Sequence, residues 1–204
     1  MGGGRTIFGK RIKKQIIKEQ KTIGVVGVSR GTGTTFCTMM MAYYIKQVIK
    51  AKTAVVERNV SGSLLSLPSF YEEETIASIK GIDILGQQKE EKEISAYSYL
   101  LFDYGTRVKQ MQETIFPNFF DCKIKLVTAS LCFWRQEELF HFVETWSKIQ
   151  GNEEWIYLIP FASSSAVKKM EKQLCRKMYT VALEQEWYRM GTANLALWNK
   201  ILKE

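Results

Sequence analysis

The chain has 204 residues, of which 46% are hydrophobic and 25% are charged, and its formal net charge is +8. This length suits one well-buried α/β domain and is short for two, and the apolar content argues against disorder. No apolar run reaches the ~18 to 20 residues that span a bilayer, and no secretory signal is evident. The four cysteines are widely spaced without a C-x-x-C pair, which argues against a zinc site. Reduced thiols of this kind are typical of a cytoplasmic protein.

The positive charge is concentrated near the start of the chain. Residues 1–22 hold seven lysines and arginines against one glutamate, so they supply most of the net charge. Phe8, Ile12 and Ile16 lie on one helical face, with the cations largely opposite, which predicts an amphipathic helix over residues 6–21. We interpret residues 1–20 as a basic N-terminal arm and residues 21–204 as a single domain. The arm either packs on the domain as a solvated helix or uses residues 5–21 to bind an anionic membrane surface, nucleic acid or an acidic partner.

The rest of the chain alternates short apolar runs with segments of helical periodicity. Strands are expected at residues 23–28, 52–58, 81–86, 97–103, 123–129, 155–160 and 179–183. One helix is expected to begin at the loop of residues 29–35 and to run to about residue 50, and others are expected at 87–95, 107–116, 136–149, 163–178 and 194–202. Residues 64–79 are expected to form a loop and then a short helix. Continuous apolar strands predict an α/β fold with a mostly parallel, twisted sheet and helices on both faces, like that of P-loop NTPases.

Ligands of such sheets bind at the carboxyl ends of the strands. The segments that follow strands are 29–35, 57–62, 103–106 and the stretch from Pro160 onward. The first of these, S-R-G-T-G-T-T, joins an apolar strand to a helix, so its amides and the helix dipole create an anion site. We expect the loop to bind the phosphates of a nucleotide through Ser29, Arg30, Gly31, Thr32, Gly33, Thr34, Thr35 and Phe36.

Two further strand ends supply oxygen ligands and polar groups. Thr35 falls where a P-loop places its Mg²⁺-ligating hydroxyl, and Asp103 ends an apolar strand, where a Mg²⁺-organising acid is expected. The expected cofactor is therefore ATP or ADP with Mg²⁺. Glu57 and Asn59 follow the second strand and are the candidates for a catalytic role.

On these motifs the chain resembles the MinD/ParA group of P-loop ATPases, of the SIMIBI class, whose loop reads K-G-G-x-G-K-[ST]. The match places Ser29 at the signature lysine, Arg30 at the first glycine and Thr34 at the second lysine, so both lysines are absent and the Walker A loop is degenerate. The family's strand-two motif, apolar-D-x-D, is V-E-R-N here. Glu57 takes the place of the first aspartate, and Asn59 takes the position that orients water in the family.

Two other parts of the resemblance concern the switch region and a subgroup. Asp103 matches the switch-II aspartate of the family, but Y-G-T follows it rather than the usual D-x-P-x-G. The run G-T-G-T-T at residues 31–35 is similar to the loop of the CpaE/TadZ proteins of tad-pilus machinery. The resemblance also implies protein partners, including a second copy of the chain as a homodimer.

The missing lysines bear on activity because phosphoryl transfer depends on positioning and on neutralising charge. By analogy with oxyanion holes, losing one preorganised donor costs about 2.7 to 4 kcal/mol. We therefore interpret the chain as a pseudo-ATPase that acts as a binding or localising module for a pilus or secretion machinery or for a partition machinery. Two alternatives remain. One is an active ATPase in which Arg30 and Glu57 replace the missing groups; the other is a protein that binds no nucleotide and works through its basic arm, peripheral to the membrane or on nucleic acid.

The sequence also predicts the surroundings of one cysteine and of several aromatic residues. Cys37 lies one turn into the helix behind the loop, where the dipole lowers a thiol pKa unless the side chain is buried in the core. Phe161 comes just after the strand expected at 155–160 and is a candidate for stacking on a base. The core is expected to include Phe119, Phe120, Trp134, Phe140 and Phe142.

Overall fold

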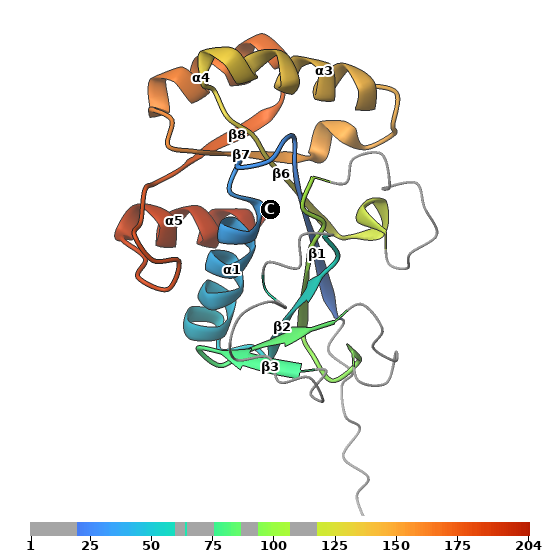
Figure 1. Ribbon diagram of the computed structural model, residues 1–204, viewed down its shortest axis with the longest axis vertical. Coiled ribbons are helices and arrows are strands. Elements are labelled where there is room, and N and C mark those ends of the chain that lie inside the picture. The colour runs from blue at the N-terminus through green and yellow to red at the C-terminus, as the bar shows by residue number, and fades with distance from the viewer. Residues whose placement is uncertain (1–19, 60–63, 65–75, 87–93, 107–117) are drawn as a thin grey trace, which may run out of the picture.

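The computed structural model describes residues 20–59, 64, 76–86, 94–106 and 118–204, and these hold an eight-stranded sheet (Figure 1). The strands are β1 Lys21–Gly27, β2 Thr53–Glu57, β3 Ile76–Ile79, β4 Ile82–Leu85, β5 Tyr99–Asp103, β6 Ile124–Thr128, β7 Ile156–Pro160 and β8 Lys177–Val181. Their order in the sheet is β3-β4-β2-β5-β1-β6-β7-β8. Every neighbouring pair is parallel except β3 and β4.

The central strands are buried on both faces. All five residues of β2, of β5 and of β7 are buried, which explains why these strands read as continuous apolar runs without polar alternation. The mostly parallel α/β architecture expected from the sequence is confirmed.

Helices cover the two faces separately. They are α1 Thr34–Tyr44, which continues into the π-helical segment η1 Ile45–Ile49, and α3 Gln136–Trp146, α4 Ser164–Leu174 and α5 Thr192–Ile201, with short 3₁₀ turns η3 Phe119–Asp121, η4 Phe133–Arg135 and η5 Asn152–Glu154. Residues of α1 and α5 share one core with Ile23 and Val55, whereas residues of α3 and α4 share the other with Val26 and Phe102. Figure 1 shows these two helix pairs on different sides of the strands.

Helix α1 is the most deeply placed of the helices. Its buried residues include Met39, Met40, Met41 and Ala42, and it contacts β1, β2, β5, β6 and α5. A helix that is apolar nearly all round is stable only inside a core. The packing therefore fixes the first turn of α1 against the carboxyl edge of the sheet, where the site is expected.

One element differs in type from the prediction. Residues 76–79, expected in a short helix, form the edge strand β3, which pairs antiparallel with β4. The two-residue turn between them, Lys80–Gly81, has positive φ at both positions, 53° and 77°. That is the backbone of a type I′ hairpin turn, whose twist matches that of the strands. Hairpin pairing thus determines the conformation of this stretch.

The boundary between α4 and β8 also differs. The helix expected over 163–178 ends at Leu174, because Cys175 adopts a left-handed conformation with φ 51°. Strand β8 then begins at Lys177, two residues earlier than expected, and pairs with β7.

Several predicted segments lie outside the described residues. These are the basic arm up to residue 19, the helix at 107–116 and most of the helix at 87–95. At the start of the described chain, the Gln20 side-chain amide donates to the carbonyls of Ile94 and Tyr97 at 2.8 and 2.9 Å. Within the described ranges no helix combines the length and apolar character needed to cross a membrane.

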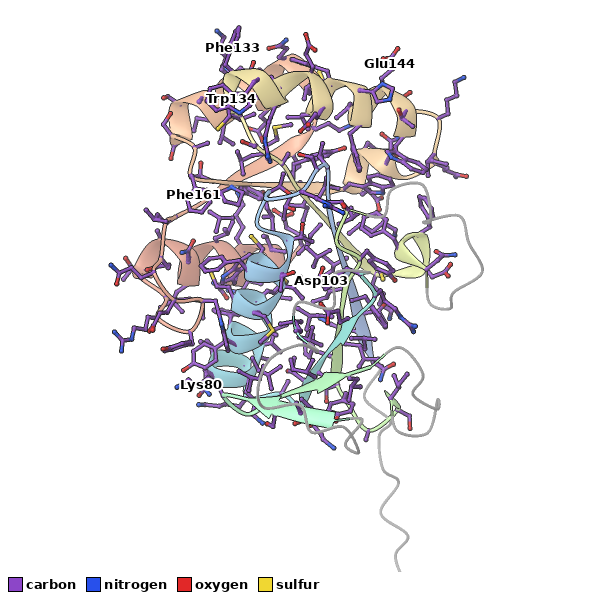
Figure 2. All side chains as sticks on the ribbon, in the orientation of Figure 1. Lys80, Asp103, Phe133, Trp134, Glu144 and Phe161 are labelled. Atoms are coloured by element: carbon purple, nitrogen blue, oxygen red, sulfur yellow. The ribbon has the colours of Figure 1, made fainter. Side chains whose placement is uncertain are left out.

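The aromatic core is mostly as expected, with one correction. Phe119 and Phe142 are buried and each contacts the ring of Trp155. Trp134, expected in the core, is 79% exposed, and its neighbour Phe133 is 86% exposed. Both belong to the short turn η4 at the carboxyl edge, ahead of α3, and therefore face solvent; Figure 2 places them at the outer end of the molecule.

Candidate phosphate-binding site

The register of the strands brings the expected site residues to one edge of the sheet. Glu57 and Val25 are both paired with Asp103, from the two sides of β5. On the other side of β1, Gly27 is paired with Thr128 of β6. The loop after β1 therefore lies beside the acid that ends β5 and the threonine that ends β6.

The loop itself presents unpaired backbone donors at the start of a helix. Gly31 and Gly33 have φ of 77° and 84°, in the left-handed region that favours glycine. Gly33 is the N-cap of α1 and no side chain caps the helix, whose first turn contains no acid. Among the described residues, nothing accepts a hydrogen bond from the N–H groups of Arg30, Gly31 or Gly33. These free donors and the helix dipole favour an anion.

A cluster of three hydroxyls fills the base of the loop. Thr128 lies 2.8 Å from the Thr34 hydroxyl and 3.0 Å from the Thr32 hydroxyl, and Thr32 also donates to the Ser29 carbonyl at 2.9 Å. Thr34, which the family resemblance aligns with the second lysine, is buried. Its hydroxyl is therefore engaged with β6, and it brings no positive charge to the site.

Ser29 is the residue that the family resemblance aligns with the signature lysine. Its Oγ is buried and has no hydrogen-bond partner in the described part of the chain. Because buried hydroxyls in folded proteins are nearly always paired, this orphaned atom fits a ligand with oxygen acceptors, such as a phosphate.

Asp103 and Thr35, the two residues expected to hold Mg²⁺, lie next to each other. The Thr35 hydroxyl donates to Asp103 Oδ2 at 2.6 Å, and the Gly105 N–H donates to Oδ1 at 2.9 Å. Burial raises the pKa of Asp103, and the neighbouring Glu57 raises it further, whereas hydrogen bonds from Thr35, Gly105 and Asn59 act in the opposite direction. Figure 2 shows Asp103 in the interior, next to α1.

A hydroxyl beside a carboxylate is a donor set that suits Mg²⁺. No group of three or more acidic, histidine or cysteine side chains with metal-binding geometry is found among the residues that the structure describes. A magnesium ion at Thr35 and Asp103 would therefore take its remaining ligands from phosphate and water, as this ion commonly does.

Glu57 and Asn59 reach the site but are enclosed by protein. Glu57 is fully buried, and the Leu64 N–H donates to both of its carboxylate oxygens at 3.0 and 3.1 Å. Asn59 is 5% exposed and packs against Gly105 so closely that a Cβ on that glycine would lie 2.5 Å from the Asn59 Cβ. Both side chains therefore shape the surroundings of Asp103. The last residues of the 57–62 segment lie outside the described ranges.

The structure adds two residues that the sequence reasoning missed. The Thr128 hydroxyl is hydrogen-bonded to the hydroxyls of Thr32 and Thr34 in the loop. Arg135 donates a hydrogen bond from Nη1 to the Arg30 carbonyl. The same guanidinium nitrogen would lie 3.6 Å from a Cβ on Gly31. Thr128 is the last residue of β6, and Arg135 lies in the turn η4 on the connection that follows it. Had the residues after the strand expected at 123–129 also been considered, because ligands bind at the carboxyl ends of parallel strands, this segment would have been included among the candidates.

The structure also describes the surroundings of Cys37, Phe36 and Phe161, which the sequence singled out near the loop or at a strand end. Cys37 is buried, and burial together with Asp103 raises the pKa of its thiol to about 12, so the dipole-lowered pKa is wrong and core packing is right. Phe36 is half-buried and packs against the core around α1. Phe161 directly follows β7, with φ 64°, and is 68% exposed; its stacking on a base stays a prediction.

No known family model and no curated protein matches the sequence, but solved structures match the fold. A plasmid partition protein from Borrelia burgdorferi B31 bound to AMPPNP has a TM-score of 0.60 at 14% identity, covering 91% of this chain and 98% of the other. A MinC:MinD cell division protein complex from Aquifex aeolicus gives 0.63 at 12%, covering 90% and 96%. The chain has a MinD/ParA-like P-loop fold. MinD from Pyrococcus horikoshii with Mg-ADP, which shares this MinD/ParA-like fold, gives 0.56 at 11%, covering 89% and 94%.

Proposed function

We propose that this chain binds a nucleoside di- or triphosphate with Mg²⁺ at the loop of residues 29–36 and hydrolyses it no faster than background. In this role it is a nucleotide-responsive binding or localising module. The observation that carries the proposal is the loop, which keeps the backbone donors of a phosphate site but places neutral hydroxyls at both lysine positions.

The binding half of the proposal depends on groups that need no lysine. The free N–H groups of Arg30, Gly31 and Gly33, the uncapped start of α1 and the orphaned Ser29 hydroxyl all favour an anion with several oxygens. Thr35 and Asp103 would hold Mg²⁺, which supplies positive charge to the phosphates when it is bound.

The weak hydrolysis follows from missing charge and a missing base. Charge that builds up on the transferring group must be neutralised, and neither Ser29 nor Thr34 can do so. Asn59 carries a neutral amide at the water-orienting position, so it cannot accept a proton from water. The carboxylate of Glu57 is buried and already accepts the Leu64 N–H.

The structural neighbours support the choice of ligand and of role. Proteins of the same fold have been seen with AMPPNP and with Mg-ADP, and one occurs in a complex of MinC with MinD. We extend the proposal to protein partners, a second copy of the chain among them, within a pilus or secretion machinery or a partition machinery. The basic arm of residues 5–21 would add a contact to a membrane surface or nucleic acid.

Calorimetry with ATP and with ADP, each with Mg²⁺ and with EDTA, tests the binding half. We expect saturable binding that weakens without Mg²⁺ and in Thr35→Ala, because the magnesium ligand is lost. The absence of any binding heat at millimolar nucleotide would overturn the proposal and would show that the loop is a structural feature of the fold that binds no nucleotide.

Two further measurements separate the alternatives. An active ATPase that uses Arg30 and Glu57 would release phosphate over many turnovers and lose that activity in Arg30→Ala and Glu57→Gln. A protein that works through its arm would bind anionic vesicles or DNA with a steep salt dependence, and deletion of residues 1–20 would abolish that binding without changing nucleotide affinity.

A further inference from the structure

We propose that Arg135 supplies the positive charge that the phosphate loop lacks, by pairing its guanidinium with the terminal phosphates of the bound nucleotide. The inference rests on the proposed function and names the residue that would take over the electrostatic part of the missing lysines. The charge would come from the turn η4, on the connection that follows β6, instead of from the loop.

The guanidinium of Arg135 lies against the loop backbone. Its Nη1 donates to the Arg30 carbonyl, and Nη1 and Nη2 would lie 3.6 and 3.9 Å from a Cβ on Gly31. The N–H of Gly31 is one of the donors that have no acceptor in the described chain. Cationic and backbone donors thus converge on the same part of the loop.

The position of Arg135 is held by its own segment. Its N–H donates to the Cys132 carbonyl at 2.8 Å, and the Gln136 side chain donates to the Leu131 carbonyl at 3.0 Å. Arg135 is also the last residue of η4 and the N-cap of α3. A cation fixed in this way loses little conformational freedom when it pairs with a phosphate, so more of the interaction contributes to affinity.

The charge of Arg135 is not neutralised by the described protein. No carboxylate of a described residue lies within 4.0 Å of its guanidinium, although Glu137 and Glu138 follow it in the first turn of α3. A guanidinium has five N–H donors in a planar fork, and its one acceptor among the described residues is the Arg30 carbonyl. The other donors match the oxygens of a phosphate, which arginine binds in a bidentate manner.

Arg30 is the other cation near the loop, but its side chain is exposed and makes no hydrogen bond to any described side chain or backbone group. The structure therefore positions Arg135 and leaves the direction of Arg30 unspecified. A single guanidinium strengthens binding without restoring both lysines and the water-orienting acid. The inference is consistent with a protein that holds nucleotide and cleaves it poorly.

The test compares Arg135→Gln, Arg135→Lys and the wild type by calorimetry with ATP, ADP and AMP in the presence of Mg²⁺. Arg135→Gln should weaken ATP binding by about 10- to 100-fold, the range for a charged hydrogen bond, and should weaken AMP binding much less. Arg135→Lys should recover part of the loss because the charge remains. Arg189→Gln is the matched control, since Arg189 pairs with Glu186 and its neighbour Tyr188 packs on Tyr43 at the far end of α1.

The outcomes distinguish the inference from the proposed function. If the wild type binds ATP and Arg135→Gln binds it within about twofold as tightly, the inference is wrong and the proposed function stands. Equal losses for ATP and AMP would also overturn it, since they would show that Arg135 only supports the loop. If the wild type binds no nucleotide, both the proposed function and the inference about Arg135 are wrong.

A second measurement uses the unaltered protein and so does not depend on folding of a variant. Phenylglyoxal modifies accessible arginines, and peptide mass spectrometry reads each site separately. ATP with Mg²⁺ should slow modification of Arg135 at least several-fold and leave Arg189 unchanged. Equal modification of Arg135 with and without bound ATP would contradict the inference.

Discussion

Replacing Gly27 with alanine should damage the base of the phosphate loop. A Cβ on Gly27 would lie 2.4 Å from the Thr34 hydroxyl and 2.8 Å from the Thr32 hydroxyl. Real Cβ atoms do not approach oxygens this closely, so one or both hydroxyls must move. Both are hydrogen-bonded to Thr128, at 2.8 and 3.0 Å, and a shift large enough to admit the methyl group would break those bonds.

The size of the effect follows from these contacts. Two buried hydrogen bonds contribute about 0.5 to 1.5 kcal/mol each, and inserting a methyl group into packed protein typically costs about 1 to 3 kcal/mol. Gly27→Ala should therefore lower the free energy of unfolding by about 3 kcal/mol. The backbone itself adds no strain, because φ at Gly27 lies outside the left-handed region.

Urea unfolding of a double-mutant cycle tests this reasoning. Thr34→Ala removes the hydroxyl that is nearest to the new methyl group, so Gly27→Ala should cost about 1 kcal/mol less in that background. Gly86→Ala is the control, since a Cβ there meets no atom within 4 Å and should change stability little. A cost below about 0.5 kcal/mol for Gly27→Ala, or no coupling to Thr34, would refute the packed hydroxyl cluster.

Three more predictions concern the same edge of the sheet. Gly33→Ala should destabilise the protein by about 1 to 2 kcal/mol in urea unfolding, because φ is 84° and the Cβ would lie 3.2 Å from the Pro160 Cγ; an unchanged midpoint would contradict the left-handed N-cap. Burial raises the pKa of Asp103 above its unfolded value, so its contribution to stability is present at acid pH and lost as the pH rises through the folded pKa. Wild type should therefore lose stability relative to Asp103→Asn between acid and neutral pH, while the variant loses Mg²⁺-dependent binding; parallel pH curves would argue against the buried carboxylate. With a thiol reagent at neutral pH, exposed Cys132 should react quickly and buried Cys37, whose pKa is about 12, only on unfolding; equal rates would place Cys37 at the surface.

The sheet and the meeting of its strand ends could be predicted from the sequence for a physical reason. Parallel strands covered on both faces must be apolar throughout, and their carboxyl ends share one edge, so Asp103 and Thr35 were expected near each other. The alternation of strands and helices predicted helices on both faces of the sheet, and the two separate cores around α1 and α3 confirm it.

Other features depended on contacts that a single sequence does not reveal. The β3–β4 hairpin depends on the backbone conformation of Lys80, which few non-glycine residues adopt. The solvent-facing position of Trp134 follows from the short turn η4, which does not continue the periodicity of α3. The side-chain direction of Arg135 depends on a hydrogen bond to a residue more than a hundred positions away in the chain.

Equilibrium dialysis of the wild-type protein against ATP with Mg²⁺, with the nucleotides on both sides separated and quantified, tests the central claim most directly. It reports in one experiment how much nucleotide the protein holds and whether that nucleotide has been cleaved. We expect an excess of ATP on the protein side, with ADP no more abundant than in a protein-free control. Equal nucleotide on both sides would contradict the proposed binding site, and conversion of ATP to ADP over many turnovers would contradict the proposal that a loop with Ser29 and Thr34 in place of lysines does not support hydrolysis.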